Sequence, residues 1–410
     1  MSKPTTGHNL ARIRRQAGLT QEQLAERSEV GVETIRKLEQ GTRSPRLKTL
    51  HALARALGVA TVALIGDQTE AVVRAQPGSR PLSLAEIRRA VVPIRSLGGG
   101  YLTATPDEPP PPEALRSRLR TADRAYQAND YGAALSLLPP LLLDARAAAG
   151  SATGETQSAA YVLVARALHL TGNLLIQLRA GDLAQTALSD ALDAAESAGD
   201  QVVAATVMQG MCWLLMRQGR LAEAADLAVA TADQIEPRFS RATPEELAAW
   251  GWLTMGAAAA YARNNEPDTA KQLVDAAAAA AAAIGERQPT SGHLIMVSGF
   301  DASRVQMQRV ENAAIAGDPA RTLDLAALVP HGPTPVGSSW QRHRLDVAWA
   351  HAQRRQYAEA TAVLMELWRI APSWLRHQRY ARDIVTAISN GRRRAMSAEL
   401  ADLASLVGCS

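Results

Sequence analysis

Residues 21–40 read QEQLAERSEVGVETIRKLEQ, and this stretch decides the fold of the N-terminal part of the chain. Thr20 stands before it as a helix-capping residue, and the residues that follow have the apolar spacing of a helix. A break at residues 29–31 separates them from a second helical run that starts at Val32. The apolar residues expected to fasten the two helices are Leu24, Val30, Ile35 and Leu38, with the small Ala25 where the helices cross. The sequence therefore predicts two short helices joined by a tight turn.

Further helices flank this pair. One is expected from Asn9 to Ala17, another follows Ser44-Pro45, and Thr61–Ile65 supplies a last turn, so residues 1–66 should form a bundle of five helices. These residues contain 11 Lys and Arg and five Glu, a net charge of +6, whereas the whole chain carries only +4. A small basic unit on a near-neutral body indicates a module that binds a polyanion, and nucleic acid is the expected partner.

Residues 9–66 resemble the helix-turn-helix of the XRE family, which includes the phage repressor and Cro proteins. After the two helices, the family's usual phrase continues as Glu39-x-Gly41, Ser44-Pro45 and LKTLHALARALGV. In such a module the second helix of the pair enters the major groove of double-stranded DNA. The resemblance implies base contacts from Val32, Glu33, Thr34 and Lys37, in which Lys37 donates to guanine and Glu33 accepts from cytosine. It implies phosphate contacts from Gln21, Gln40, Arg43, Arg46 and Lys48. For each residue, a solvated helix face is the alternative.

Two positions depart from the family pattern. Glu29 occupies the turn position where the family usually has glycine, and Gly31 stands where Ser or Thr usually caps the recognition helix. Glu29 must therefore adopt a backbone conformation that glycine prefers, at a cost of about 1 kcal/mol. The family also implies a structural ion pair between Arg14 and Glu39.

Residues 67–112 change in composition. The run Gly98-Gly99-Gly100 is expected to be flexible, and the prolines of 109–112 favour an extended chain. One helix is expected in the segment SLAEIRRAVV. The sequence thus predicts a linker with one short helix between two separable parts.

From 113 to 408 the sequence predicts repeated pairs of helices. An alanine-rich helix, a break containing Gly, Asn, Gln or Asp, and a second helix recur six times, with apolar anchors at Tyr131, Leu183, Leu221, Pro267, Pro319 and Tyr357. Intervals of 38 to 52 residues between these anchors are typical of a solenoid. The pattern resembles tetratricopeptide repeats, so the fold class is all-α, a helix-turn-helix bundle joined to an α-solenoid.

In tetratricopeptide arrays the first helix of each pair lines a curved groove. Carried over to this chain, the groove positions are Arg179, Trp213, Arg217, Trp252, Met255, Arg263, Arg304, Glu311, Arg342 and Trp349. The resemblance places Arg179, Arg217 and Arg263 at one equivalent position in three successive units. Three guanidinium groups along one groove would bind carboxylates or peptide carbonyls. For each tryptophan, packing inside the core is the alternative.

The combination resembles the RRNPP-type regulators, in which a peptide signal in the groove changes the DNA-binding state of a dimer. It equally resembles the repeat-bearing XRE regulators of actinobacteria. We therefore predict a cytoplasmic, homodimeric transcriptional regulator that binds an inverted-repeat DNA site and a peptide or small-molecule effector, expected to be anionic. The alternative is a scaffold whose repeats bind a protein partner, with incidental DNA contact.

Other classes of protein find less support in the sequence. It contains no Gly-rich phosphate loop, HExxH or Gly-x-Ser-x-Gly motif, and its eight histidines are scattered, so no catalytic residue, metal site or cofactor is expected. Cys212 and Cys409 are too few for a disulfide framework. No signal-peptide core or membrane-length uncharged run is evident.

Overall fold

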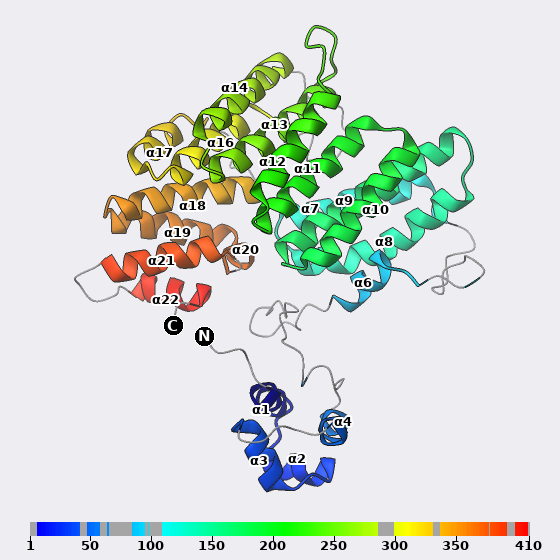
Figure 1. Ribbon diagram of the computed structural model, residues 1–410, viewed down its shortest axis with the longest axis vertical. Helices are drawn as coiled ribbons and strands as arrows, with labels where there is room; N and C mark the ends of the chain where they lie inside the picture. The colour runs from blue at the N-terminus through cyan, green and yellow to red at the C-terminus, as the bar shows by residue number, and fades with distance from the viewer. Residues whose placement is uncertain are drawn as a thin grey trace. The chain divides into compact units, whose positions relative to one another are not determined.

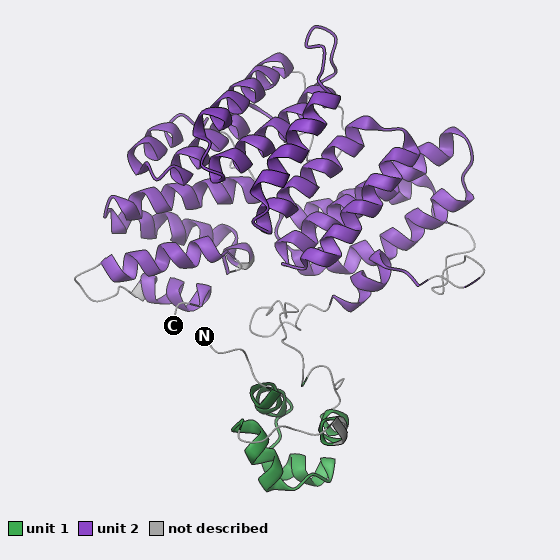
Figure 2. Ribbon diagram, viewed as in Figure 1, with its two compact units in different colours: residues 1–75 green, residues 76–410 purple. Residues whose placement is uncertain are grey.

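The protein is described by a computed structural model, in which helices form two compact units, residues 1–75 and 76–410 (Figure 2). The described residues are 6–41, 47–57, 64, 84–94, 97, 109–285, 299–330, 337–376, 378–391 and 398–408. Within them no β-strand occurs, in agreement with the all-α class expected from the sequence.

Four helices make up the described part of the first unit. They are α1 (Thr6–Gln16), α2 (Gln21–Ser28), α3 (Val32–Glu39) and α4 (Leu47–Ala56) (Figure 1). The fifth helix expected at Thr61–Ile65 lies outside the described residues apart from Leu64, which is buried. The core of the unit is formed by Leu10, Ile13, Leu19, Leu24, Ile35, Leu38, Leu50, Leu53, Ala54 and Leu64, with Ala25 and Val30 packed against it.

The turn between α2 and α3 has the geometry that the sequence required. The Thr20 side chain accepts a hydrogen bond from the backbone of Gln23, whose own side chain accepts one from the Thr20 backbone, so α2 starts in a capping box. Glu29 ends α2 in the left-handed region, with φ 56° and ψ 25°. Gly31 precedes α3 and supplies no side-chain cap. Glu29 thus bears the strain that glycine would avoid.

The second unit begins with a short helix and continues as paired helices. Helix α6 (Ala85–Val91) packs against α8 (Tyr131–Ser151) and α10 (Gly181–Ala198), and Arg146 of α8 donates hydrogen bonds to the carbonyl oxygens of Ala90 and Val91. The first helices of the pairs are α7 (Pro112–Gln127), α9 (Glu155–Gln177), α11 (Gln201–Arg217), α13 (Pro244–Arg263), α16 (Ala302–Ile315) and α18 (Ser338–Gln353). The second helices are α8 (Tyr131–Ser151), α10 (Gly181–Ala198), α12 (Leu221–Gln234), α14 (Pro267–Ile284), α17 (Pro319–Ala326) and α19 (Tyr357–Ile370). The unit closes with α20 (Pro372–Arg376), α21 (Arg379–Gly391) and α22 (Ala398–Val407).

Each pair turns through one residue in the left-handed region. These residues are Asn129, Arg179, Gly219, Asn265, Gly317 and Arg355, each two positions before the second helix begins. Five of the six anchors recognised in the sequence are the first residue of that helix. The exception is Leu183, because α10 begins two residues earlier, at Gly181.

This shift corrects the expected column of arginines. Arg217 and Arg263 are each the last residue of an inner helix, whereas Arg179 lies in the turn after α9. The residue equivalent to Arg217 in that unit is Gln177. The turn has the same length as in the other units, and the register was misread because Leu183 was taken as the first residue of the second helix in place of Gly181.

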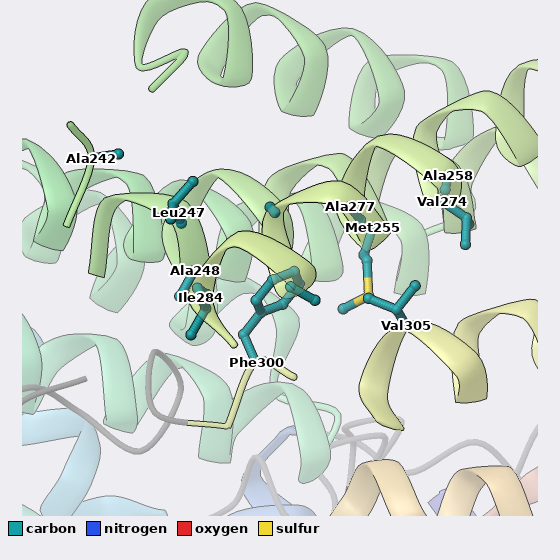
Figure 3. Packing of buried hydrophobic residues seen from close by; sticks show 12 residues of the cluster. Ala242, Leu247, Ala248, Met255, Ala258, Val274, Ala277, Ile284, Phe300 and Val305 are labelled. Carbon is teal, nitrogen blue, oxygen red and sulfur yellow. The ribbon is translucent and has the colours of Figure 1, made fainter. Parts of the chain in front are cut away.

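Small residues allow the helices around α13 to approach closely. A Cβ at Gly251 would lie 2.1 Å from the Phe300 ring, so this contact requires glycine. Figure 3 shows Met255 directed from α13 toward Val305 of α16, and both side chains belong to one buried cluster with Phe300. In the run Ala276–Ala283, the residues Ala277, Ala280 and Ala281 are buried, as expected of a closely packed helix. This packing fixes the inner face of α13.

Among the described residues, one helix, α9, is long and apolar enough to cross a membrane. Its most apolar stretch is 78% buried inside the repeats. Its apolar surface is therefore accounted for by packing in the core.

Candidate functional site

The outer face of α3 presents the residues expected to meet DNA bases. Val32 is 37% exposed, and the side chains of Glu33 and Lys37 are also exposed, while Thr34 is half-buried. Glu33 forms ion pairs with Arg36, at 2.7 Å, and with Lys37, at 3.4 Å. The hydrogen bond from Arg36, with the charge of Lys37, lowers the pKa of Glu33. Contact between Lys37 and a base would therefore have to compete with Glu33.

A buried ion pair joins α1 to the end of α3. Arg14 donates to both carboxylate oxygens of Glu39, at 2.7 and 2.9 Å, and both side chains are at most 10% exposed. Gln21 donates to the same carboxylate at 2.7 Å. Burial raises the pKa of Glu39, but the hydrogen bonds from Arg14 and Gln21 outweigh it and the pKa is lowered. The Arg14–Glu39 pair that the resemblance implied is thus present.

This network bears on the expected phosphate contacts. The amide of Gln21 is already engaged by Glu39, so it has one remaining N–H for a phosphate. Gln40 is exposed at the end of α3. Arg43, Arg46 and the side chain of Lys48 lie outside the described residues.

The inner helices of the second unit surround one cavity of about 820 Å³. Its walls come from α7, α9, α11, α13, α16, α18, α20 and α21, with Gly181 at the start of α10, so the first and last parts of the array contribute to the same space. Of the ten groove residues expected from the sequence, nine line it: Arg179, Trp213, Arg217, Trp252, Met255, Arg263, Arg304, Glu311 and Arg342. A volume of this size is typical of sites for small organic ligands.

Trp349 is the exception. It occupies the position in α18 that Trp213 occupies in α11, but it is not among the lining residues. At this end of the array the wall is made by Trp374 of α20 and Arg379 of α21, which follow in the chain and which the repeat pattern did not place. Equivalence between repeats therefore fails where the array ends.

The cavity carries an excess of positive charge. The lining residues include six arginines, Arg179, Arg217, Arg263, Arg304, Arg342 and Arg379, against the two carboxylates Glu311 and Asp346. The pKa of Arg217 is lowered, first by desolvation and then by repulsion from Arg179, Arg342 and Arg263. Among the described residues, Arg217 has no ion-pair or hydrogen-bond partner. An anion placed beside Arg217 would relieve this repulsion.

Three of the six arginines already have a counterion. Arg379 lies 3.9 Å from Asp383 of its own helix, and the other two share one carboxylate. Arg263 donates to Glu311 at 2.6 Å, and Arg342 lies 3.5 Å from the same carboxylate oxygen. Burial alone would raise the pKa of Glu311, but the charges of Arg263 and Arg342 lower it to about 2. The anion-binding capacity of the cavity is thus concentrated away from Glu311, toward Arg217.

Apolar and amide side chains complete the walls. Trp213, Trp252 and Trp374 add flat surfaces, and Met216, Met255 and Met307 add flexible ones. Sequence reasoning missed the lining residues Gln127, Gln177, Gln209, Gln308, His343, Asp346 and Trp374. Gln209 could have been found from the sequence, because Gln209, Trp213 and Arg217 are four residues apart and therefore lie on one face of the same helix.

Comparison with known proteins gives matches at the N-terminus. Residues 10–64 match the family model described as Helix-turn-helix. The chain is 48% identical over 64 residues to an uncharacterized HTH-type transcriptional regulator, y4dJ, of Sinorhizobium fredii, covering 83% of that protein and 16% of this chain. It is 37% identical over 65 residues to the immunity repressor protein of Bacillus phage phi105, covering 45% of that protein and 16% of this chain.

Two solved structures are similar over most of the chain at low identity. One is Bacillus thuringiensis PlcR in complex with the peptide PapR7 and DNA, with 13% identity, a TM-score of 0.38, and coverage of 86% of this chain and 98% of that one. The other is the apo form of ComR from S. thermophilus, with 12% identity, a TM-score of 0.26, and coverage of 91% and 97%.

Proposed function

We propose, from the premise that this chain belongs to the helix-turn-helix family of DNA-binding transcriptional regulators, that its repeat unit binds an effector which changes how a homodimer holds its operator. The effector is a short peptide or a small molecule with an anionic group. The regulator acts in the cytoplasm, where its DNA is. Residues 1–66 form the DNA-binding domain, and residues 67–112 form the linker between the domains. Residues 113–408 bind the effector and form the dimer.

The observation that supports an effector is the charge of the cavity. Six arginines face two carboxylates around one space, and Arg217 lacks a counterion among the described residues. Holding guanidinium groups close together costs stability unless an anion is bound there. The tryptophan and methionine walls favour an apolar body on that anion. Together these features support a binding site for an anionic ligand with an apolar body.

An effector acts on DNA binding only through its preference for one arrangement of the dimer. Because the linker joins the two units, a change in how two repeat units associate would alter the distance between two recognition helices. Paired helices must lie about 34 Å apart, or a multiple of it, to enter successive major grooves on one face of DNA. A modest rearrangement is therefore sufficient to switch binding.

The first prediction concerns the operator. The full chain is expected to protect an inverted repeat as a dimer, because one recognition helix contacts too few base pairs for selectivity. Footprinting combined with the mass of the complex measures this. Protection of a single asymmetric half-site by a monomer would refute the proposal.

The second prediction concerns Lys37. Lys37→Ala is expected to weaken operator binding by about 1–3 kcal/mol and to relax preference at one base pair, since a base contact discriminates among sequences. Titration of the operator and of its single-base variants measures both effects. A loss equal on operator and random DNA would instead assign Lys37 to a phosphate, because phosphate contacts weaken binding to all sequences alike.

A further inference from the structure

Buried polar atoms that lack hydrogen bonds gather on the effector cavity. Ten of the described residues have such an atom. Six of them line the cavity, namely Asn173, Gln209, Arg304, Arg342, His343 and Asp346, and the other four, Arg166, Trp340, Gln341 and Arg344, do not. A buried polar atom without a partner is costly, so native proteins retain few of them away from functional sites. The distribution points to a ligand that supplies the missing hydrogen bonds.

Asp346 is the most demanding member of this group. It is 1% exposed, and both of its carboxylate oxygens are buried without a hydrogen bond of normal geometry. A guanidinium nitrogen of Arg342 lies 3.5 Å away, but Arg342 is shared with Glu311 at the same distance and stacks on the Tyr380 ring at 4.4 Å. The Tyr380 hydroxyl also interacts with the carboxylate. Asp346 thus retains acceptor capacity that only a donor inside the cavity can satisfy.

The charges around Asp346 are nearly balanced. The titratable groups that interact with it are Arg342 of its own helix, Arg263 of α13, Glu311 of α16 and Tyr380 of α21. His343 lines the same cavity. Arg263 and Arg342 offset Glu311 and Asp346. Burial, with a smaller contribution from Arg344, lowers the pKa of His343 to about 4, so this ring is neutral near pH 7. Among these neighbouring groups, a cation at Asp346 therefore meets an open carboxylate and no net positive charge.

We propose that Asp346 is the subsite for a protonated primary amine, so that the effector is a zwitterion with its ammonium at Asp346 and its anionic group at Arg217. An ammonium group brings three donors on one atom, and bonds between charged donors and carboxylates are the strongest of the ordinary hydrogen bonds. The proposal rests on the proposed function in taking this cavity as the effector site. It adds the second pole of the ligand.

Three fragments of one shape test the two poles separately: 3-phenylpropylamine, 3-phenylpropanoate and the neutral 3-phenylpropan-1-ol. Binding to the full chain is measured by thermal unfolding and by titration at pH 7.5. The amine is expected to bind the wild type and to bind Asp346→Asn roughly tenfold or more weakly, as the loss of a charge-assisted bond implies. The carboxylate is expected to lose affinity in Arg217→Ala and to bind Asp346→Asn as it binds the wild type.

Asp226→Asn is the matched control, because Asp226 is an exposed carboxylate of α12 that does not line the cavity. Asparagine is isosteric with aspartate and removes a buried charge, so Asp346→Asn should fold. Equal amine binding to wild type and Asp346→Asn, or none to either, would overturn the amine subsite. Alcohol binding as strong as that of the amine would also overturn it, in favour of a neutral donor. If the amine results are as expected but the carboxylate does not bind the wild type, or binds Arg217→Ala equally well, the anionic pole at Arg217 is refuted and the amine subsite at Asp346 is supported.

The pH dependence supplies an independent readout. Burial, reinforced by Glu311 and opposed by Arg342 and Arg263, raises the pKa of Asp346 to about 7. Since only the ionised carboxylate attracts an ammonium, amine affinity is expected to rise between pH 6 and pH 8, where the amine itself stays protonated. Asp346→Asn should bind the amine with no such rise. A flat profile in the wild type would contradict the proposal.

Discussion

An Arg217→Ala variant is expected to lose most of its response to the effector. Arg217 is the cavity arginine whose guanidinium is crowded by Arg179, Arg263 and Arg342 and has no counterion among the described residues. Removing a charge-assisted bond to a carboxylate costs about 1.5–3 kcal/mol, or roughly ten- to 150-fold in affinity. The measurement is operator binding with and without the small-molecule fraction of a cell extract, comparing the variant with the wild type.

The structure shows why Arg217 is a sharper target than Arg263. Arg263 is held by Glu311 at 2.6 Å, so its removal would leave a buried carboxylate with Arg342 alone. Such a variant confounds effector binding with damage to the ion-pair network. Arg354→Ala is the control, because Arg354 is exposed after the end of α18 and does not line the cavity. An unchanged effector response in Arg217→Ala would place the effector elsewhere.

Glu39→Ala is expected to destabilise the DNA-binding unit by about 3 kcal/mol, because it leaves the buried guanidinium of Arg14 unpaired. Gln21 would lose its acceptor as well. Hydrogen exchange of α1 and α3 measures the effect, and an increase of more than a hundredfold in their exchange rates is expected. Operator affinity should fall with it.

The chain offers an internal control for this experiment. All seven tryptophans lie between Trp213 and Trp374, so tryptophan fluorescence reports on the repeat unit. It should be unchanged in Glu39→Ala. Glu26→Ala, which alters an exposed carboxylate of α2, should leave exchange in α1 and α3 close to that of the wild type. Exchange in Glu39→Ala no faster than in Glu26→Ala would show that the pair contributes little.

The same pair predicts sensitivity to acid. Arg14 and Gln21 hold the pKa of Glu39 below its ordinary value. A carboxylate whose pKa is lowered by folding stabilises the folded state above the unfolded pKa of about 4.3, and this contribution is lost as the pH falls through the folded pKa. Exchange in α1 and α3 should therefore accelerate below about pH 4 in the wild type, with little change in Glu39→Ala.

The local features of the DNA-binding unit were determined by the sequence alone. Thr20 acts within one turn of its own position, so the start of α2 follows from residue chemistry. The left-handed conformation of Glu29 was expected from the position at which the family usually has glycine. The apolar residues of 21–40 recur with helical spacing and all pack together as expected. The six breaks between paired helices were recognisable for the same reason, since a left-handed residue two positions before a helix is a local event.

The tertiary structure alone decided which side chains share the cavity and which neutralise one another. Arg263 and Glu311 are 48 residues apart, and Asp346 belongs to a third helix, so their charges meet only because the inner helices converge on one space. The repeat pattern placed Arg217 correctly but misaligned Arg179 by two residues and extended the groove to Trp349, because it assumed that every unit is alike. The pairing of Glu311 and the open carboxylate of Asp346 depend on distances between helices, which spacing along one helix does not encode.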